Sequence, residues 1–168
     1  MKSHEALGKA WHKPKEMEGY KELLIGLRSK HTITRVKNPL RLNRAHSVGY
    51  KAKPGFITVH VKIKKGGRKR RQVHRGRKPS KMGIKGFTTK KSLQLIAEER
   101  ANKKYPNCEV LNSYWLAEDG RHKWFEVILL DRINPSVLSD NEVSKVVKRR
   151  KRVYRGLTKS GRKMRSLL

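Results

Sequence analysis

The chain has 168 residues, and its 44 Lys and Arg residues against 13 Asp and Glu residues give a formal net charge of +31. Small soluble domains usually carry a net charge of about 2–8 in magnitude, so some polyanion must normally neutralise this one. No apolar run approaches the ~20 residues of a membrane helix, and a single cysteine excludes an intrachain disulfide and a zinc site with two cysteine ligands.

The first part of the chain is predicted to contain two helices and two strands. Apolar residues spaced i, i+3, i+4 and i+7 favour a helix over residues 16–27, after a weaker helical pattern that ends before Pro14. Alternating β-branched residues favour a short strand over residues 32–36 and a longer one over residues 56–63. Residues 40–50 show no such periodicity and are expected to be irregular.

The longer strand has two unlike faces, because successive side chains of a strand point to opposite sides. Val59 and Val61 share a face with two isoleucines, and we expect this face to lie in the core. Thr58 and His60 lie on the other face. We expect His60 to face solvent or a bound RNA rather than a metal ion, since no nearby residue completes a ligand set.

The second half of the chain reads as a helix, a hairpin and another helix. Thr88 or Thr89 is the expected N-cap of a helix that ends near Lys104. Its inner stripe is expected to contain Leu93, Ile96, Ala97, Arg100 and Ala101, with Glu98 and Glu99 outside. A strand over residues 108–116, a turn at residues 118–120 and a strand over residues 124–130 follow. The last strand is apolar on both faces and is expected to be central; residues 135–147 are expected to form a short helix.

The positive charge is concentrated in two blocks. Residues 62–91 contain 14 Lys or Arg, residues 145–165 contain 11, and neither block contains an acidic residue. Like charges in a block repel one another, which favours extended arms until a partner neutralises them. We therefore expect one domain over residues 1–168. Its core is expected to be formed by about residues 32–63 and 88–147, with a basic loop at 64–87 and a basic tail at 148–168.

No set of residues predicts catalysis. Four acidic residues between 118 and 131 are of the type that binds magnesium in nucleases, but Asp119 lies in the turn, and Glu126 and Asp131 fall on opposite faces of a strand. The seven histidines are scattered, and Cys108 is expected to be a small buried apolar residue. The sequence therefore predicts a binding protein rather than an enzyme.

The partner that fits these cations is a nucleic acid. Arginine binds phosphate through two donors and stacks on bases, whereas lysine acts as a point charge. Trp11, Tyr50, His74 and Tyr154 have rings that would either stack on unpaired bases or pack in the fold. Compact DNA readers place one helix in the major groove, but here the charge lies on irregular segments, which favours a folded RNA. A DNA-compacting chromatin protein is the alternative, and an RNA-processing enzyme is disfavoured.

Several segments carry a family pattern. Residues 40–53 contain Leu40-Arg41-Leu42-Asn43-Arg44-Ala45 and Gly49-Tyr50-Lys51-Ala52-Lys53, which resemble the RLxxARxxGYKAKxG motif of the archaeal and eukaryotic large-subunit ribosomal protein family called fifteen-e. Further resemblances follow in order at residues 67–71, 97–101, 111–115, 119–120, 123–129 and 154–162. Pro54 and Arg132 depart from the pattern, and the short tail resembles that of archaeal members.

The resemblance implies an α+β fold, with a small antiparallel sheet, packed helices and long basic extensions that bind ribosomal RNA (rRNA). It implies a structural constituent of the large ribosomal subunit in the cytoplasm. The expected partners are large-subunit rRNA and neighbouring large-subunit proteins, with no membrane, no small-molecule substrate and no cofactor apart from Mg²⁺ held by the rRNA. The residues expected to contact RNA are Arg41, Arg44, Tyr50, Lys51, Lys53, Arg68, Lys69, Arg70, Arg71, Arg75, Arg77, Lys78, Lys81, Lys85, Arg152, Arg155, Arg162, Lys163 and Arg165.

Overall fold

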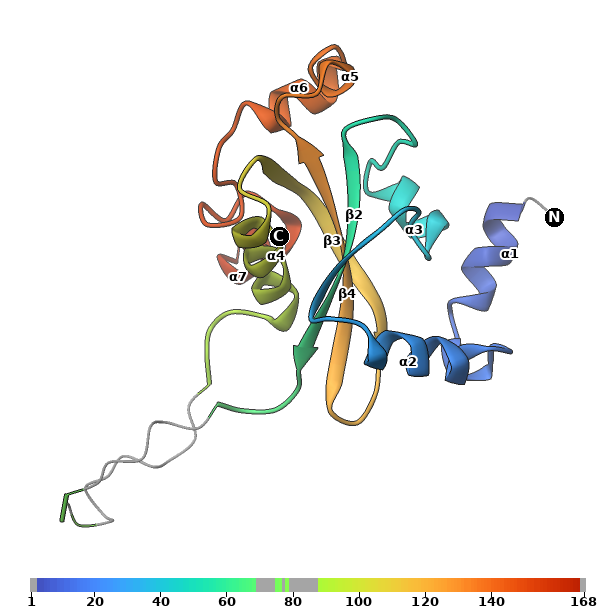
Figure 1. Cartoon of the computed structure of the whole chain (residues 1–168), viewed down its shortest axis with the longest axis vertical. Helices are drawn as coiled ribbons and strands as arrows, with labels where there is room; N and C mark the ends of the chain where they lie inside the picture. The colour runs from blue at the N-terminus through green and yellow to red at the C-terminus, as the bar shows by residue number, and fades with distance from the viewer. Residues whose placement is uncertain (1–2, 69–74, 77, 79–87, 167–168) are drawn as a thin grey trace.

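The structure, a computed structural model, describes residues 3–68, 75–76, 78 and 88–166. In these residues four antiparallel strands form one sheet, with helices on both of its faces (Figure 1), which confirms the α+β class. The strand order is β1-β2-β4-β3. The strands are β1 (Ile33–Val36), β2 (Phe56–Lys64), β3 (Cys108–Glu118) and β4 (His122–Asp131).

Seven α-helices and one 3₁₀ turn surround the sheet in the described part of the chain. They are α1 (Ser3–Ala10), the 3₁₀ turn Pro14–Glu16, α2 (Tyr20–Ser29), α3 (Leu42–Ser47), α4 (Leu93–Lys104), α5 (Pro135–Leu138), α6 (Asn141–Val147) and α7 (Lys159–Met164). Each of these helices is too short and too polar to cross a lipid bilayer.

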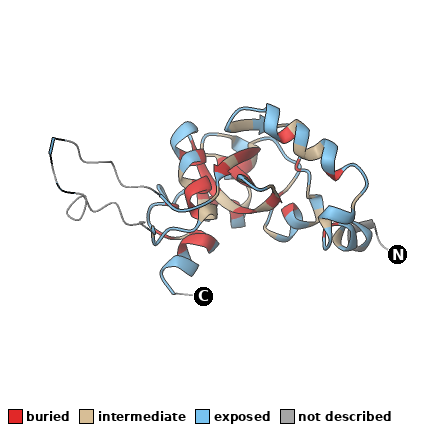
Figure 2. Cartoon of the chain, turned by 90° about the horizontal axis from the view of Figure 1, so that it is seen from below, coloured by how far each residue is buried: buried red, intermediate tan, exposed pale blue. Residues whose placement is uncertain are grey.

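Strand β4 is central, as its apolar pattern predicts. Val127 pairs with Val59 of β2 on one side and with Ser113 of β3 on the other. Every residue from 124 to 130 is buried. Figure 2 shows the buried residues gathered in the interior of the folded part, with exposed residues around them. The β3–β4 turn is fixed by Asp119, whose Oδ1 accepts the backbone N–H of His122 at 2.6 Å.

Helix α4 covers one face of the sheet and forms the largest part of the core. Ile96 and Ala97 pack with Val59 and Val127, and Leu95, absent from the expected stripe, is also buried. The helix begins later than expected, because its N-cap is Ser92, whose hydroxyl accepts from the N–H of Leu95. The N-cap prediction at Thr88 or Thr89 is therefore wrong.

Two residues of α4 lie on the opposite side from the prediction. Arg100 is exposed, whereas Glu98 has no exposed surface. The sequence predicted the reverse because an acidic residue next to Glu99 reads as a solvated face. Glu98 is instead buried because hydroxyl groups from two other segments bind its carboxylate, as described below.

The other face of the sheet is covered as well. Trp11, Tyr20 and Leu27 pack on Leu116 and Trp124, and Figure 1 shows α1, α2 and α3 on the side of the sheet away from α4. A sheet covered on both faces leaves little room for solvent, so polar residues on its second side, such as Thr58, His60 and Glu126, are buried.

His60 is the clearest consequence of this second layer. Its side chain is only 3% exposed, and its Nε2 lies 2.8 Å from Oε1 of the fully buried Glu126. Glu126 also accepts the backbone N–H of Leu40 at 2.9 Å, so the segment around residue 40 crosses over this pair. The expectation that His60 faces solvent or RNA is wrong.

Three local predictions need correction. Residues 40–50 are not wholly irregular, since they contain α3, whose Ala45 is buried. The predicted helix over residues 135–147 is two helices, because Asp140 accepts the N–H groups of Glu142 and Val143 and starts α6 anew. The predicted helix over residues 16–27 is shifted, since α2 follows a separate 3₁₀ turn.

Candidate nucleic-acid interface

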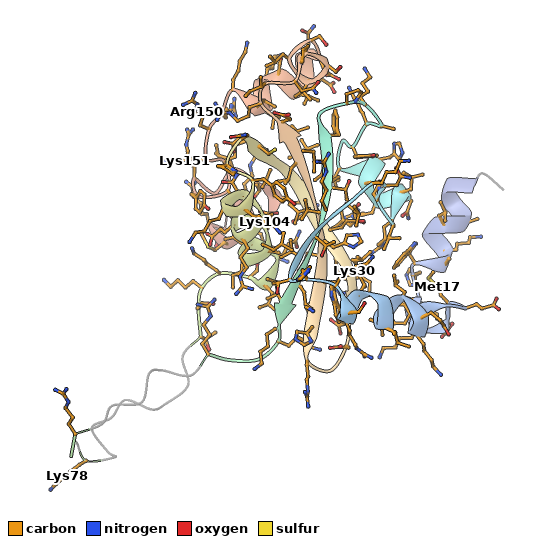
Figure 3. The ribbon with its side chains drawn as sticks, viewed as in Figure 1. Met17, Lys30, Lys78, Lys104, Arg150 and Lys151 are labelled. Carbon is orange, nitrogen blue, oxygen red and sulfur yellow. The ribbon has the colours of Figure 1, made fainter. Side chains whose placement is uncertain are left out.

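The basic loop, defined as residues 64–87, is described at both ends and at a few positions within it. Arg68, Arg75 and Lys78 are exposed. None of the three has a hydrogen bond or ion pair with another described residue. Lys78 lies far from the sheet, beyond the end of β2 (Figure 3). The other expected loop contacts lie outside the described residues, namely Lys69, Arg70, Arg71, Arg77, Lys81 and Lys85.

The segment with the family motif divides into residues that face outward and residues that build the fold. Arg44 and Lys53 are exposed and have no partner among the described residues. Lys51 forms an ion pair with Asp140, with Nζ 2.5 Å from Oδ2, which raises the pKa of Lys51 and lowers that of Asp140. Tyr50 is 8% exposed and its ring packs edge-on against Phe56.

Arg41 serves the fold rather than the surface. Its guanidinium lies 4.8 Å from the ring centroid of Trp11 and 5.6 Å from that of Trp115, and it donates to the carbonyl of Trp115 at 2.8 Å. Burial lowers the pKa of Arg41. Arg41 and Tyr50 are thus engaged within the protein, and the expectation that they contact RNA is not supported by their positions.

The C-terminal segment, defined as residues 148–166, is not a free tail. Val153, Thr158 and Ser160 are buried, and α7 lies beside α4 (Figure 1). Two buried carboxylates hold it. Glu109 on β3 accepts the backbone N–H groups of Lys151 and Arg152 at 2.8 and 3.3 Å.

Glu98 on α4 is the second anchor. Its carboxylate accepts the hydroxyls of Thr158 and Ser160 at 2.6 Å each, and that of Ser113 on β3. Burial raises the pKa of Glu98, and the three hydroxyls oppose that rise by stabilising the charged form. The expectation of an extended basic tail outside the core does not fit this packing.

Within the C-terminal segment, one expected RNA contact points inward. Arg152 donates through its guanidinium to the carbonyls of Val110, Leu111 and Leu157, and burial lowers its pKa. The others point outward: Arg155, Arg162, Lys163 and Arg165 are exposed. Arg155 and Arg165 make single bonds to backbone carbonyls, whereas Arg162 and Lys163 have no partner among the described residues.

Some exposed cations were missed by the sequence reasoning. Arg149, Arg150 and Lys151 precede the half-buried Arg152 and are exposed. Figure 3 shows Arg150 and Lys151 on the outside of the molecule. They belong to the same basic block, so the signal was present, but the block alone does not tell which of its members turn inward. Lys30 and Arg35 are further exposed cations on the described surface.

The four rings expected either to stack on bases or to pack in the fold differ in how far they are buried. Trp11 and Tyr50 are buried, so their rings belong to the fold. Tyr154 is 52% exposed, while its hydroxyl donates to the carbonyl of Glu99 at 3.3 Å. His74 lies outside the described residues.

The described residues offer no metal or thiol chemistry. They contain no cluster of three His, Cys, Asp or Glu residues able to hold a metal ion. Cys108 is buried, and burial raises the pKa of its thiol to about 11, so it stays protonated at neutral pH.

Comparison with known proteins adds an independent result. The family model described as Ribosomal L15 matches residues 4–168. The chain is 46% identical over 172 residues to the large ribosomal subunit protein eL15 of Picrophilus torridus, covering 99% of this chain and 88% of that protein. It is 48% identical over 150 residues to the protein of the same name from Metallosphaera sedula, covering 88% and 69%. None of these three matches supports a DNA-compacting protein.

Proposed function

The chain belongs to the Ribosomal L15 family, and from this premise we propose that two groups of exposed cations hold it on large-subunit rRNA. The resemblance to the fifteen-e family is confirmed. As a family member, the chain is a structural constituent of the large ribosomal subunit in the cytoplasm, not an enzyme. Its partners are rRNA and other ribosomal proteins, and the contacts themselves are the proposal.

The first group belongs to the basic loop and the motif segment. Arg44, Lys53, Arg68, Arg75 and Lys78 are exposed, and among the described residues nothing neutralises them. Cations left without acidic partners on a folded protein are available to phosphate oxygens, and releasing the counterions of the RNA drives the binding. The exposure of these five cations, together with their lack of acidic partners, is the observation that supports the proposal. The expected contacts outside the described residues extend the same group.

The second group lies on the C-terminal segment. Glu98 and Glu109 fix the backbone of this segment to the core, so Arg155, Arg162 and Lys163 project from a defined position. A fixed segment loses less conformational entropy on binding than a free tail. We propose that this group supports orientation on the RNA as well as affinity, and that Mg²⁺ enters only with the rRNA.

Sedimentation tests the proposal. The tagged chain, expressed in an archaeal host, should sediment with the large subunit in a sucrose gradient and remain there after DNase treatment. It should leave the subunit after RNase treatment. Release by DNase, or sedimentation apart from the subunit, would contradict the proposal.

A further inference from the structure

Two adjoining cavities lie where the basic loop leaves the core, between the end of β2 and the start of α4. Their volumes are about 630 and 610 Å³. Both fall within the range of about 300–1,000 Å³ found for small organic ligands. Residues shared by the two linings are Arg68, Thr88, Thr89, Lys91, Ile96 and Arg100, so the cavities form one continuous hollow.

The first cavity has an apolar floor and a cationic rim. Ile63, Leu93 and Ile96 line it, and the two isoleucines are 2% and 7% exposed. No acidic residue lines it. Its cations are Lys64, Lys65, Arg68, Lys91 and Arg100. The neighbouring cavity adds one acidic residue, Glu99.

Some of these cations are neutralised within the protein and others are not. Lys91 Nζ lies 2.7 Å from Glu99 Oε1, and Lys65 Nζ lies 3.9 Å from Glu118 Oε1. The side chains of Lys64, Arg68 and Arg100 make no hydrogen bond or ion pair with the rest of the described chain. The hollow therefore combines apolar contact surface with uncompensated positive charge.

We propose that this hollow receives one unpaired nucleotide of the rRNA. Its base lies against Ile63, Leu93 and Ile96, and its phosphate lies between Arg68 and Arg100. An unpaired nucleotide has both parts, because a base face packs on apolar side chains while the phosphate pairs with cations. A phosphate alone would leave the floor uncovered, and an apolar side chain of another protein would leave the cations unpaired.

The inference rests on the proposed function and is tested separately from it. The chain is bound to large-subunit rRNA, and the reactivity of the rRNA bases in the complex is measured with dimethyl sulfate and a carbodiimide. Hydroxyl-radical cleavage of the same samples maps the backbone footprint. Thr89→Trp fills the hollow without changing charge, and Arg100→Ala removes the phosphate partner. Lys103→Ala is the matched control, since it removes an exposed cation of the same helix outside the hollow.

The wild type and Lys103→Ala should protect one unpaired base. Thr89→Trp and Arg100→Ala should lose that protection, so that its reactivity returns to the value in free rRNA, while the backbone footprint elsewhere persists. Thermal melting of each variant confirms folding. If the backbone footprint persists and neither Thr89→Trp nor Arg100→Ala makes any base more reactive, the nucleotide site is refuted and the proposed function still stands. Absence of any wild-type footprint would overturn both.

Discussion

The hydroxyl of Thr158 donates a hydrogen bond of 2.6 Å to Oε2 of Glu98, sixty residues earlier in the chain. The same carboxylate accepts from Ser160 at 2.6 Å and from Ser113. Glu98 thus joins α4, β3 and the C-terminal segment at one buried point. The Glu98 carboxylate, on the side of α4 that faces the core, therefore links the core to the cations of the C-terminal segment.

Replacing Glu98 by glutamine should change how stability depends on pH. Burial raises the pKa of Glu98 above its ordinary value of 4.5. A group whose pKa is raised by folding stabilises the protein fully below its unfolded pKa and loses that contribution as pH rises through its folded pKa. From pH 4.5 upward, the wild-type free energy of unfolding should therefore fall relative to that of Glu98→Gln. Urea unfolding across this pH range measures the difference.

The control for this experiment is Glu99→Gln, at the neighbouring position on the more exposed side of α4. If the profiles of the wild type and Glu98→Gln ran parallel, Glu98 would have no part in the pH dependence.

Two helical glycines should respond in opposite ways to alanine. A Cβ at Gly161 in α7 would lie 2.7 Å from the Cα of Gly156, where backbone cannot yield easily, whereas a Cβ at Gly26 in α2 meets nothing within 4 Å. Gly161→Ala should cost about 1–3 kcal/mol through overpacking. Gly26→Ala should stabilise by about 0.5–1 kcal/mol, because alanine loses less backbone entropy in a helix. Chemical denaturation of both variants checks the two signs, and equal signs would refute the close approach at Gly161.

Trp124 should be a large contributor to stability. Its side chain is 1% exposed and packs with Trp11 and Leu116. Trp124→Ala should therefore cost about 3–5 kcal/mol, measured by urea unfolding. Trp115→Ala is the comparison, since Trp115 is only partly buried, and its cost should be smaller. An unchanged unfolding curve for Trp124→Ala would show that the ring is not packed as described.

The basic loop should control the salt dependence of RNA binding. Changing Arg68, Lys69, Arg70 and Arg71 together to alanine should flatten the slope of log K against log salt by about 3, at roughly 0.7–0.9 per lost phosphate contact. Folding should barely change, because Arg68 is exposed and its side chain makes no hydrogen bond or ion pair with another described residue. Filter binding to rRNA over a range of salt concentrations gives the slope.

Arg152→Ala is the counterpart in the C-terminal segment. It should lower stability by about 1–3 kcal/mol, because it removes the guanidinium donor that the carbonyls of the buried Val110 and the partly buried Leu111 share. Its salt slope should match the wild type. If the loop variant with Arg68, Lys69, Arg70 and Arg71 changed to alanine kept the wild-type slope of log K against log salt, the loop cations would not contact phosphates.

Much of the sheet was predictable because its signal is local. Residues 124–130, apolar except for Glu126, fit a strand buried on both faces, and Asp119 beside a glycine marks the turn before it. The burial of three acidic residues, Glu98, Glu109 and Glu126, was not predictable. Glu98 reads as solvated because its partners Thr158 and Ser160 are sixty residues away, in a block whose composition predicts a free arm.

The candidate nucleic-acid interface was likewise predictable only in part. Charge density located the basic loop and the C-terminal segment, because polyanion binding depends on charge more than on its detailed placement. It did not separate Arg41 and Arg152, which bind backbone carbonyls, from Arg44 and Arg162, which are exposed. That separation depends on packing of distant segments, which the order of charges along the chain does not encode.

The central place of β4 also determines the order in which a nascent chain can fold. β2 pairs with β4, and β4 is complete only when residue 131 has been synthesised. Until then β2 lacks its central neighbour, and α4 has no complete sheet to cover. Residues 23–97, with 22 cations and no acid, are synthesised before β4 is complete. Such a segment attracts nearby polyanions, so early binding to RNA would keep it from misassembly before the sheet can close.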